Sequence, residues 1–452
     1  MKEARTDFYR DIYKIAIPVT LQSLIMAILT LTDQLMVGQL GDVAIASVGI
    51  SNKIYAVVSV SLAGLATGVS IYAAQFWGKG DKKSISGLLG LGLMIGLGLS
   101  LLFTVPIHLF PEAGFRLFTT DEALVTEGAV FLGIVSLSYI PAMLTMIYSS
   151  ILRATGYVKL PLFASTGAVI VNVVLNYGLI FGHFGFPELG LKGSAVATLI
   201  ARLLECGFII GASFWLRLPG TTDVRGWFTA SGPFIRRFLG TTYPIVLNEL
   251  IWVLGETVYA VIYSRMGTAE ITAMTITYPL QGLSIGLLSG LSSAAGIIIG
   301  NKLGADEPDT ALDYSKRFIR LGISVSLATG VLIAVLSPLY VSLFKVSDEA
   351  HTLGIRLVWV FAFFLWVKVS NMILAGGTLN SGGDSRFVFA MESAATWLIG
   401  VPSGLLMSLV WKQPIFWVYM VLSVEELVRF FIGLARIYSR KWMKNLVADV
   451  SA

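Results

Sequence analysis

Long apolar stretches, separated by short charged or Gly/Pro-rich segments, run through the whole chain. A helix that crosses a bilayer needs about 20 mostly apolar residues, whereas a strand of a membrane barrel needs only about 10. The stretches are therefore too long for barrel strands. We predict about twelve membrane-spanning helices, near residues 11–37, 47–77, 88–110, 125–152, 160–181, 191–217, 238–265, 272–301, 316–344, 351–379, 386–409 and 413–440.

The composition agrees with an all-α, polytopic membrane protein. Hydrophobic residues make up 56% of the 452 residues and charged residues 13%, whereas soluble domains carry about 25% charged residues. Cys206 is the single cysteine, which excludes an internal disulfide. The first apolar stretch is longer than the core of a cleavable signal, about 7–15 residues, so we expect it to be retained as the first helix.

Basic residues gather in alternate connecting segments, for example Lys79, Lys82 and Lys83, then Arg153 and Lys159. Cytoplasmic loops of membrane proteins carry an excess of Lys and Arg. The pattern predicts that both termini are cytoplasmic, which an even number of spans allows. The basic pI of about 9.1 is explained by this anchoring, and we expect the lipid bilayer, not nucleic acid, as the partner of the positive charge.

The chain is a tandem duplication. Placing Pro18 on Pro244 also aligns several apolar and glycine positions without a gap. The aligned pairs include Leu21 with Leu247, Ile25 with Ile251, Gly41 with Gly267 and Gly64 with Gly290. Because each half has an even number of spans, both enter the membrane with the same orientation. We predict an N-terminal six-helix lobe over residues 1–218, a cytoplasmic linker over 219–232 and a C-terminal lobe over 233–452.

One carboxylate, Asp33, lies within the first apolar helix. A charged aspartate at the centre of a span costs about 2.5–3.5 kcal/mol on insertion scales, and the cost falls if a proton, a cation or a partner neutralises it. The alternative is that Asp33 touches water and solvates the helix end. Acids inside a membrane are usually functional, so we interpret Asp33 as a coupling residue for H⁺ or Na⁺.

Two amides of the fifth span, Asn172 and Asn176, are four residues apart and therefore share one helix face. They can supply carbonyl oxygens to a hard cation or bond to Asp33, and the alternative is ordinary helix–helix hydrogen bonding. Thr198 is a further candidate ligand. Tyr139 is a candidate for the substrate cleft.

The second lobe has different chemistry, because Asp33 aligns with Tyr259. Glu249 and Glu256 are seven residues apart, on one face of the seventh span. Lys368 lies on the tenth. A structural interpretation pairs Lys368 with Glu249 or with Glu392 of the eleventh span, since buried opposite charges neutralise each other. The functional alternative makes unpaired Glu256 a second proton, cation or substrate site.

Aromatic side chains suit a cleft for amphipathic cations. Trp252, Tyr259 and Tyr278 fall on the inner-helix candidates of the second lobe, so we predict that they line such a cleft. Other charges are spaced as local helix pairs, namely Arg202 with Glu205 and Arg429 with Glu425 or Glu426.

Several motifs resemble the multidrug and toxic compound extrusion (MATE) family over nearly the whole chain. Pro18, then Asp33 and Gly38-Gln39-Leu40-Gly41, resemble the family's first helix. Further matches are Gln75-Phe76-Trp77-Gly78, Leu152-Arg153-Ala154-Thr155-Gly156, Leu379-Asn380-Ser381-Gly382-Gly383-Asp384 and the segment from Asn172 through Arg202. The single acid of the first helix is most like the DinF-type or NorM-type bacterial branches. Relatives often carry a second Asp on the fifth helix, and Asn176 here removes that charge.

The resemblance implies a monomeric antiporter of the bacterial inner membrane, with two lobes that alternate access. It would export amphipathic, mostly cationic small molecules in exchange for H⁺ or Na⁺, without a cofactor. The alternative within the same superfamily is a flippase or exporter of lipid-linked or polyanionic saccharides, which would need a cleft dominated by positive charge. Basic residues within spans are few, namely Lys53, Arg202, Arg356, Lys368 and Arg429.

An enzyme is not supported, because the sequence has no Walker motif and no hydrolase constellation inside the spans. The histidines are scattered near span ends, so no metal beyond Na⁺ is predicted.

Overall fold

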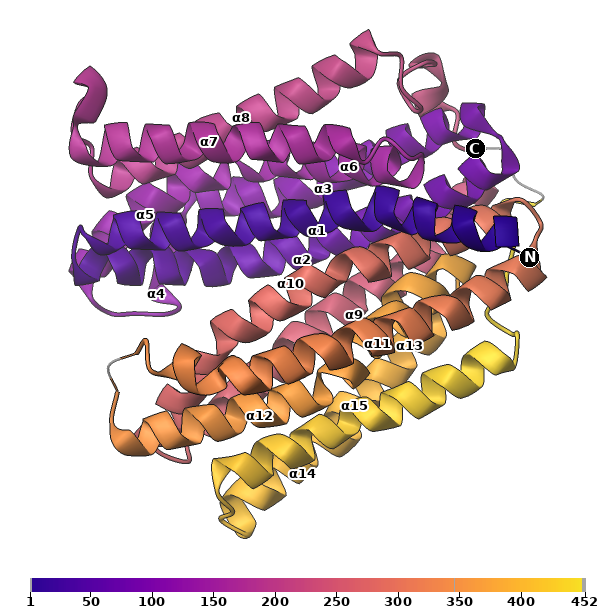
Figure 1. Cartoon of the computed structure of the whole chain (residues 1–452). Coiled ribbons are helices and arrows are strands. Elements are labelled where there is room, and N and C mark those ends of the chain that lie inside the picture. The colour runs from indigo at the N-terminus through magenta and orange to yellow at the C-terminus, as the bar shows by residue number, and fades with distance from the viewer. Residues whose placement is uncertain (1, 345, 449–452) are drawn as a thin grey trace. The chain divides into compact units, whose positions relative to one another are not determined.

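The computed structural model describes residues 2–344 and 346–448, with residues 2–7 described by their backbone alone. These residues form helices and connecting turns, with no strand among them (Figure 1). The N-terminal half contains α1 (Lys2–Gly38), α2 (Asp42–Lys79), α3 (Lys82–Leu109), α4 (Pro111–Arg116), α5 (Glu122–Ser136), α6 (Tyr139–Ala154), α7 (Lys159–Phe181), η1 (His183–Gly185), α8 (Leu191–Trp215) and η2 (Arg225–Phe228). The C-terminal half contains α9 (Gly232–Ser264), α10 (Thr268–Gly304), α11 (Pro308–Val341), α12 (Asp348–Asn371), η3 (Met372–Leu379), η4 (Asn380–Gly382), α13 (Ser385–Ala394), η5 (Ala395–Gly400), α14 (Val401–Leu405), η6 (Leu406–Val410) and α15 (Ile415–Tyr438).

Eleven helical segments of the described chain are long and apolar enough to cross a membrane. Some combine several elements: α5 and α6 form the span Glu122–Ala154, and α13 to η6 form Ser385–Val410. The twelfth predicted span is α15, which has 24 residues. It carries Glu425, Glu426 and Arg429 near its middle, so it is too charged to count as apolar. The all-α, polytopic fold is confirmed.

The chain forms two compact units, each containing a segment from the other half of the sequence. Among the described residues, the N-terminal unit comprises residues 21–246, and the C-terminal unit comprises residues 2–20 and 247–448. Helices α1 and α9 therefore each change unit along their length. The changes fall at equivalent places, since Leu21 aligns with Leu247 in the duplicated sequence. The predicted lobes were residues 1–218 and 233–452. The structure differs in that the first half of α1 packs in the C-terminal unit and the first half of α9 packs in the N-terminal unit.

The exchanged segments are held by close packing. In the N-terminal unit, Phe234 and Phe238 of α9 are buried against the ring of Tyr72, with centroids 5.6 and 5.5 Å away. In the C-terminal unit, Phe8 of α1 packs on Tyr314 and Phe318, with centroids 4.7 and 5.2 Å away. Burial of aromatic rings is a large part of core energetics, so both segments are integral parts of the unit that receives them.

Aligned glycines make both helix crossings possible. A Cβ at Gly64 would lie 2.8 Å from the Cα of Val246, and one at Gly290 would lie 2.4 Å from the carbonyl oxygen of Ala16. Thr20, one turn on, donates from Oγ1 to the carbonyl of Leu287 at 3.0 Å. Close helix approach in membranes uses small residues in this way. Both copies of the repeat thus keep the same contact.

The segment after the last helix of each half folds back onto its own unit. Trp227 of η2 covers α3, where a Cβ at Gly90 would lie 2.1 Å from its carbonyl oxygen. Trp442, which follows α15, is fully buried over Gly382. Asp384 beside it pairs with Arg436 at 2.6 Å.

Candidate functional site

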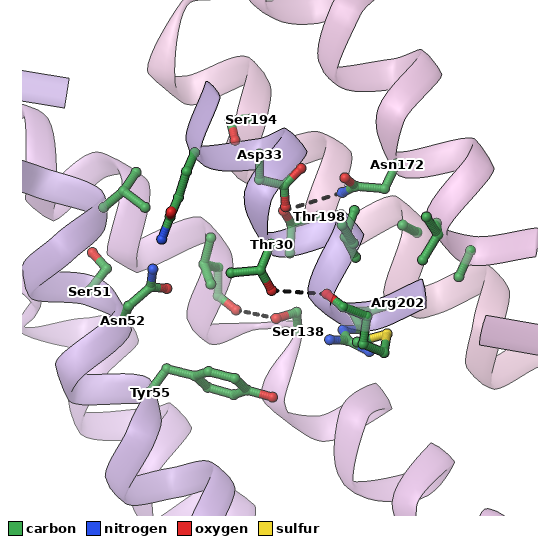
Figure 2. Close-up of a pocket in the computed structure, with 18 of the residues that line it drawn as sticks. Thr30, Asp33, Ser51, Asn52, Tyr55, Ser138, Asn172, Ser194, Thr198 and Arg202 are labelled. Carbon is green, nitrogen blue, oxygen red and sulfur yellow. Dashed lines mark hydrogen bonds between the residues drawn. The ribbon is translucent and has the colours of Figure 1, made fainter. Parts of the chain in front are cut away.

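A cavity of about 420 Å³ lies inside the N-terminal unit, among α1, α2, α5, α7 and α8. This volume is in the range of small-molecule sites, about 300–1,000 Å³. Asp33 lines it, together with polar side chains that include Thr30, Ser51, Asn52, Tyr55, Ser138 and Ser194 (Figure 2). A polar cavity inside a bundle of apolar helices is costly unless it is used, so it is the leading candidate for a transport site.

The four predicted ion-coupling residues are connected by hydrogen bonds. Asn176 donates from Nδ2 to Oδ1 of Asp33 at 2.7 Å and to Oδ1 of Asn172 at 3.0 Å. Asn172 in turn donates to Oγ1 of Thr198, at a longer 3.5 Å. Asn172 and Asn176 are both buried. The structure thus brings together residues that lie up to 165 positions apart in the sequence, and their role in coupling stays a prediction.

The fully buried amide of Asn176 is the only hydrogen-bond partner of Asp33 among the described residues. Its own Oδ1 is buried and accepts no hydrogen bond from the described chain. An unpaired buried acceptor is unusual and calls for an explanation such as a water or an ion. It is the one polar atom of the Asp33–Asn176–Asn172 group that the described residues leave buried without a partner.

Two charged residues that sequence reasoning assigned to a local pair also line this cavity. Arg202 and Glu205 of α8 form the predicted pair, with Nη1 and Oε2 2.9 Å apart. With Asp33 ionised, the lining carries two carboxylates and one guanidinium. Its formal charge is then −1, and it becomes zero when a proton or monovalent cation is bound at Asp33.

Tyr139 does not line the cavity as predicted. Its side chain is fully buried, and its ring stacks on that of Tyr55 with centroids 5.1 Å apart. Tyr55 of α2 occupies the position next to the cavity instead. One signal in the sequence pointed to it: polar Asn52 and Lys53 lie just before it in a mostly apolar helix.

A second, smaller cavity of about 80 Å³ lies within the C-terminal unit. It gathers Glu256, Lys368 and the three predicted aromatic residues, Trp252, Tyr259 and Tyr278. A water molecule needs about 10–15 Å³ of such space. The cavity has room for a few waters or an ion, but it is too small for a drug-sized molecule in this conformation.

The predicted partners of Lys368 are wrong. Its Nζ lies 3.1 Å from Oε1 of Glu426 on α15, and not beside Glu249 or Glu392. Asn371, one turn further along α12, donates to the other oxygen of Glu426 at 2.8 Å. Two donors on one face of α12 thus converge on this carboxylate, which explains the choice of partner. Glu392 accepts instead from the amide of Asn248.

Arg429 belongs to the same network of charged and polar side chains around this cavity. It donates to Glu425 at 2.8 Å and to Oγ1 of Thr396 at 2.6 Å, and its Nη1 lies 3.8 Å from Glu426. Tyr259 donates from its hydroxyl to the second oxygen of Glu425 at 2.8 Å. The predicted i, i+4 pair is therefore present. The residue aligned with Asp33 serves here as a donor to an acid from another helix.

The remaining acids of the seventh span differ in position. Glu256 lines the small cavity, whereas Glu249 does not. Neither makes a hydrogen bond or ion pair with any residue that the structure describes, apart from longer-range electrostatic effects. Glu256 is thus the acid that lines the small cavity without a hydrogen bond or ion pair to the described residues.

The MatE family model matches the chain twice, over residues 18–178 and again over residues 244–406. The chain belongs to the MatE family. The two matches begin at Pro18 and Pro244, the positions on which the duplication was aligned. MatE proteins are transporters and not enzymes, so the family and the class of protein are as predicted.

Relatives of this MatE protein match it from end to end. An uncharacterised transporter of Bacillus subtilis, YisQ, is 25% identical over 442 residues, covering 97% of this chain and 96% of YisQ. The probable multidrug resistance protein NorM of Thermotoga maritima is 21% identical and covers 99% of this chain and 96% of NorM. A solved structure of the Vibrio cholerae MATE transporter VcmN superposes with a TM-score of 0.88 at 17% identity, over 98% of both chains. The fold is thus that of a MATE transporter.

Proposed function

We propose that this MatE protein is a secondary multidrug efflux antiporter. It exports amphipathic, mostly cationic small molecules in exchange for H⁺ or Na⁺ and needs no other cofactor. It works as a monomer in the bacterial inner membrane, with both termini in the cytoplasm. The observation that carries the proposal is Asp33, an acid on the wall of a drug-sized cavity whose single hydrogen-bond partner among the described residues is Asn176. The relatives named as multidrug resistance proteins support the class of substrate.

Exchange follows from competition for one carboxylate. A cationic substrate and the coupling ion each neutralise the −1 charge of the cavity lining. Binding of one at Asp33 therefore lowers the affinity of the site for the other. Occupation of Asp33 by the ion from outside releases the substrate and favours the outward-facing state. Exchange of one proton or Na⁺ for one monovalent cation moves no net charge, so the concentration gradient of the coupling ion drives it. A tenfold ion gradient, worth about 1.4 kcal/mol, supports a substrate gradient of about tenfold.

Two coupling ions are compatible with these ligands. A proton can bind the carboxylate of Asp33 directly. Na⁺ can instead be held by that carboxylate, with the side-chain oxygens of Asn172 and Thr198 on the same cavity wall as further ligands. Against the flippase alternative, the described lining of the cavity has two carboxylates for one guanidinium, where a polyanionic substrate would need an excess of positive charge.

Efflux from proteoliposomes tests the proposal. The protein is reconstituted and the export of a cationic dye is followed under an imposed pH gradient or an imposed Na⁺ gradient. We expect one gradient to drive export, and Asp33→Asn to abolish that coupling. Glu256→Gln tests the candidate site of the other unit: undiminished export would leave Glu256 with a structural role. Coupled export at the native rate in Asp33→Asn would refute the proposal.

A further inference from the structure

The guanidinium of Arg202 is only partly used by the protein. Nη1 is bound to Glu205 at 2.9 Å, and the other N–H groups donate to no residue that the structure describes. The side chain is 25% exposed, whereas that of Glu205 is 4% exposed. Because Arg202 lines the 420 Å³ cavity, this remaining exposure includes the space where a substrate would bind (Figure 2).

Arg429 of the C-terminal unit has more partners than Arg202, although its buried Nε has none among the described residues. Its Nη2 donates to both Thr396 and Glu425, and its Nη1 faces Glu426. It borders a cavity of only about 80 Å³. Arg202 differs in both respects, since it has one partner and a drug-sized space in front of it.

The chemistry of arginine defines the ligand that fits. Its planar fork of N–H groups matches the two oxygens of a carboxylate, and it stays charged at any physiological pH. Glu205 holds the guanidinium in place and offsets its charge, so the fork is already oriented before a ligand arrives. Asp33 on the wall of the same cavity offers the opposite charge.

We propose that Arg202 is a carboxylate-binding subsite of the N-terminal cavity, and that its preferred substrates are zwitterions. The amine of such a molecule binds Asp33 while its carboxylate binds Arg202. This inference rests on the proposed export function and narrows its substrate class. Release would then weaken only the contact at Asp33, because a proton or cation bound there leaves the charge of Arg202 unchanged.

A matched pair of dyes tests the subsite. One is a rhodamine with a free carboxylate, and the other is its methyl ester, which keeps the cation and the ring system but lacks the acid. Binding of each dye to the purified full-length protein is measured by fluorescence anisotropy, and export of each is measured from proteoliposomes. The key variant combines Arg202→Gln with Glu205→Gln, so that no buried charge is left without its partner.

We expect the double variant to lose affinity for the carboxylate dye by about tenfold or more, since a charge-assisted fork contact is lost. Its affinity for the ester should stay within about threefold. Glu205→Gln alone keeps the guanidinium and should bind the carboxylate dye at least as well as the native protein. Arg202→Lys, which keeps the charge without the fork, should bind it at an intermediate level.

Equal changes for both dyes in the double variant would overturn the carboxylate subsite, even if the native protein exports the ester. Failure of the native protein to bind or export either dye would overturn the export function as well. Thermal unfolding of each variant separates these outcomes from misfolding, because a variant that unfolds at the native temperature has kept its structure.

Discussion

The hydrogen bond between Asn176 and Asp33 should be worth more than any neutral contact in the N-terminal unit. Asn176→Leu removes two donated bonds, one to the Asp33 carboxylate at 2.7 Å and one to Asn172 at 3.0 Å. A bond to a charged group contributes about 1.5–3 kcal/mol. A neutral bond between membrane helices contributes about 0.6 kcal/mol on average. The expected loss in the free energy of unfolding is therefore about 2–4 kcal/mol.

A double-mutant cycle isolates the charged part of this loss. In an Asp33→Leu background the carboxylate is already absent, so Asn176→Leu should cost only about 0.6 kcal/mol. The coupling free energy between the two positions should thus be about 1.5–3 kcal/mol. Unfolding in mixed micelles, followed by tryptophan fluorescence, gives all four free energies. Asn371→Leu, which removes an amide from Glu426 in the other unit, is the control and should show no coupling to Asp33.

Additive losses, agreeing within about 0.5 kcal/mol, would refute this reasoning. They would mean that Asp33 is not a charged acceptor of Asn176 in the resting protein. Dye efflux by the same variants supplies a second measurement. Asn176→Leu should slow coupled export in the native background, and it should change nothing further once Asp33 has been replaced.

Two further predictions concern the packing of the C-terminal unit. Arg429→Gln should lower the free energy of unfolding by about 3–5 kcal/mol, because it leaves the buried carboxylate of Glu425 without its ion pair; a combined Arg429→Met and Glu425→Met variant should recover most of the loss in the same unfolding assay. Gly290→Ala should cost about 1–3 kcal/mol, since the new Cβ would lie 2.4 Å from a backbone carbonyl oxygen. Gly98→Ala, which meets no atom within 4 Å, should leave the unfolding temperature unchanged or raise it.

Local sequence patterns were sufficient to predict the spans and to place Asn172 and Asn176 on one helix face. Span length follows from bilayer thickness, and the i, i+4 spacing of Asn172 and Asn176 fixes a shared helix face in any tertiary fold. Given that shared face, the hydrogen bond between Asn176 and Asp33 forms once α1 packs against α7. A bond to Asp33 was one of the roles that the sequence suggested for these amides. The duplication also follows from sequence alone, and the family matches over each half agree with it.

Tertiary contacts decided the features that the sequence could not predict. The sequence suggested Glu249 or Glu392 as the partner of Lys368, but the packing of α12 on α15 places Lys368 beside Glu426 instead. The exchange of half-helices between units could not be predicted from the helical pattern, because α1 and α9 each continue as one helix through the point where the unit changes. The position of Arg202 at the cavity was not predicted, for a different reason. Its pairing with Glu205 was predicted correctly, but the i, i+3 spacing that predicts this pair contains no information about the cavity that the guanidinium also faces.

Equivalent helices of the two units carry different charges and polar contacts. In the N-terminal unit the acid is on the first helix, it has one amide partner, and it faces a cavity large enough for a substrate. In the C-terminal unit the equivalent Tyr259 donates to Glu425, and Lys368 and Arg429 neutralise both acids of α15. A carboxylate held by fixed cations cannot exchange them for a proton or a drug without a large loss of binding energy. Coupling is therefore expected at Asp33, and a role of the C-terminal cavity in ion binding would have to pass through Glu256, the acid there that the network leaves open.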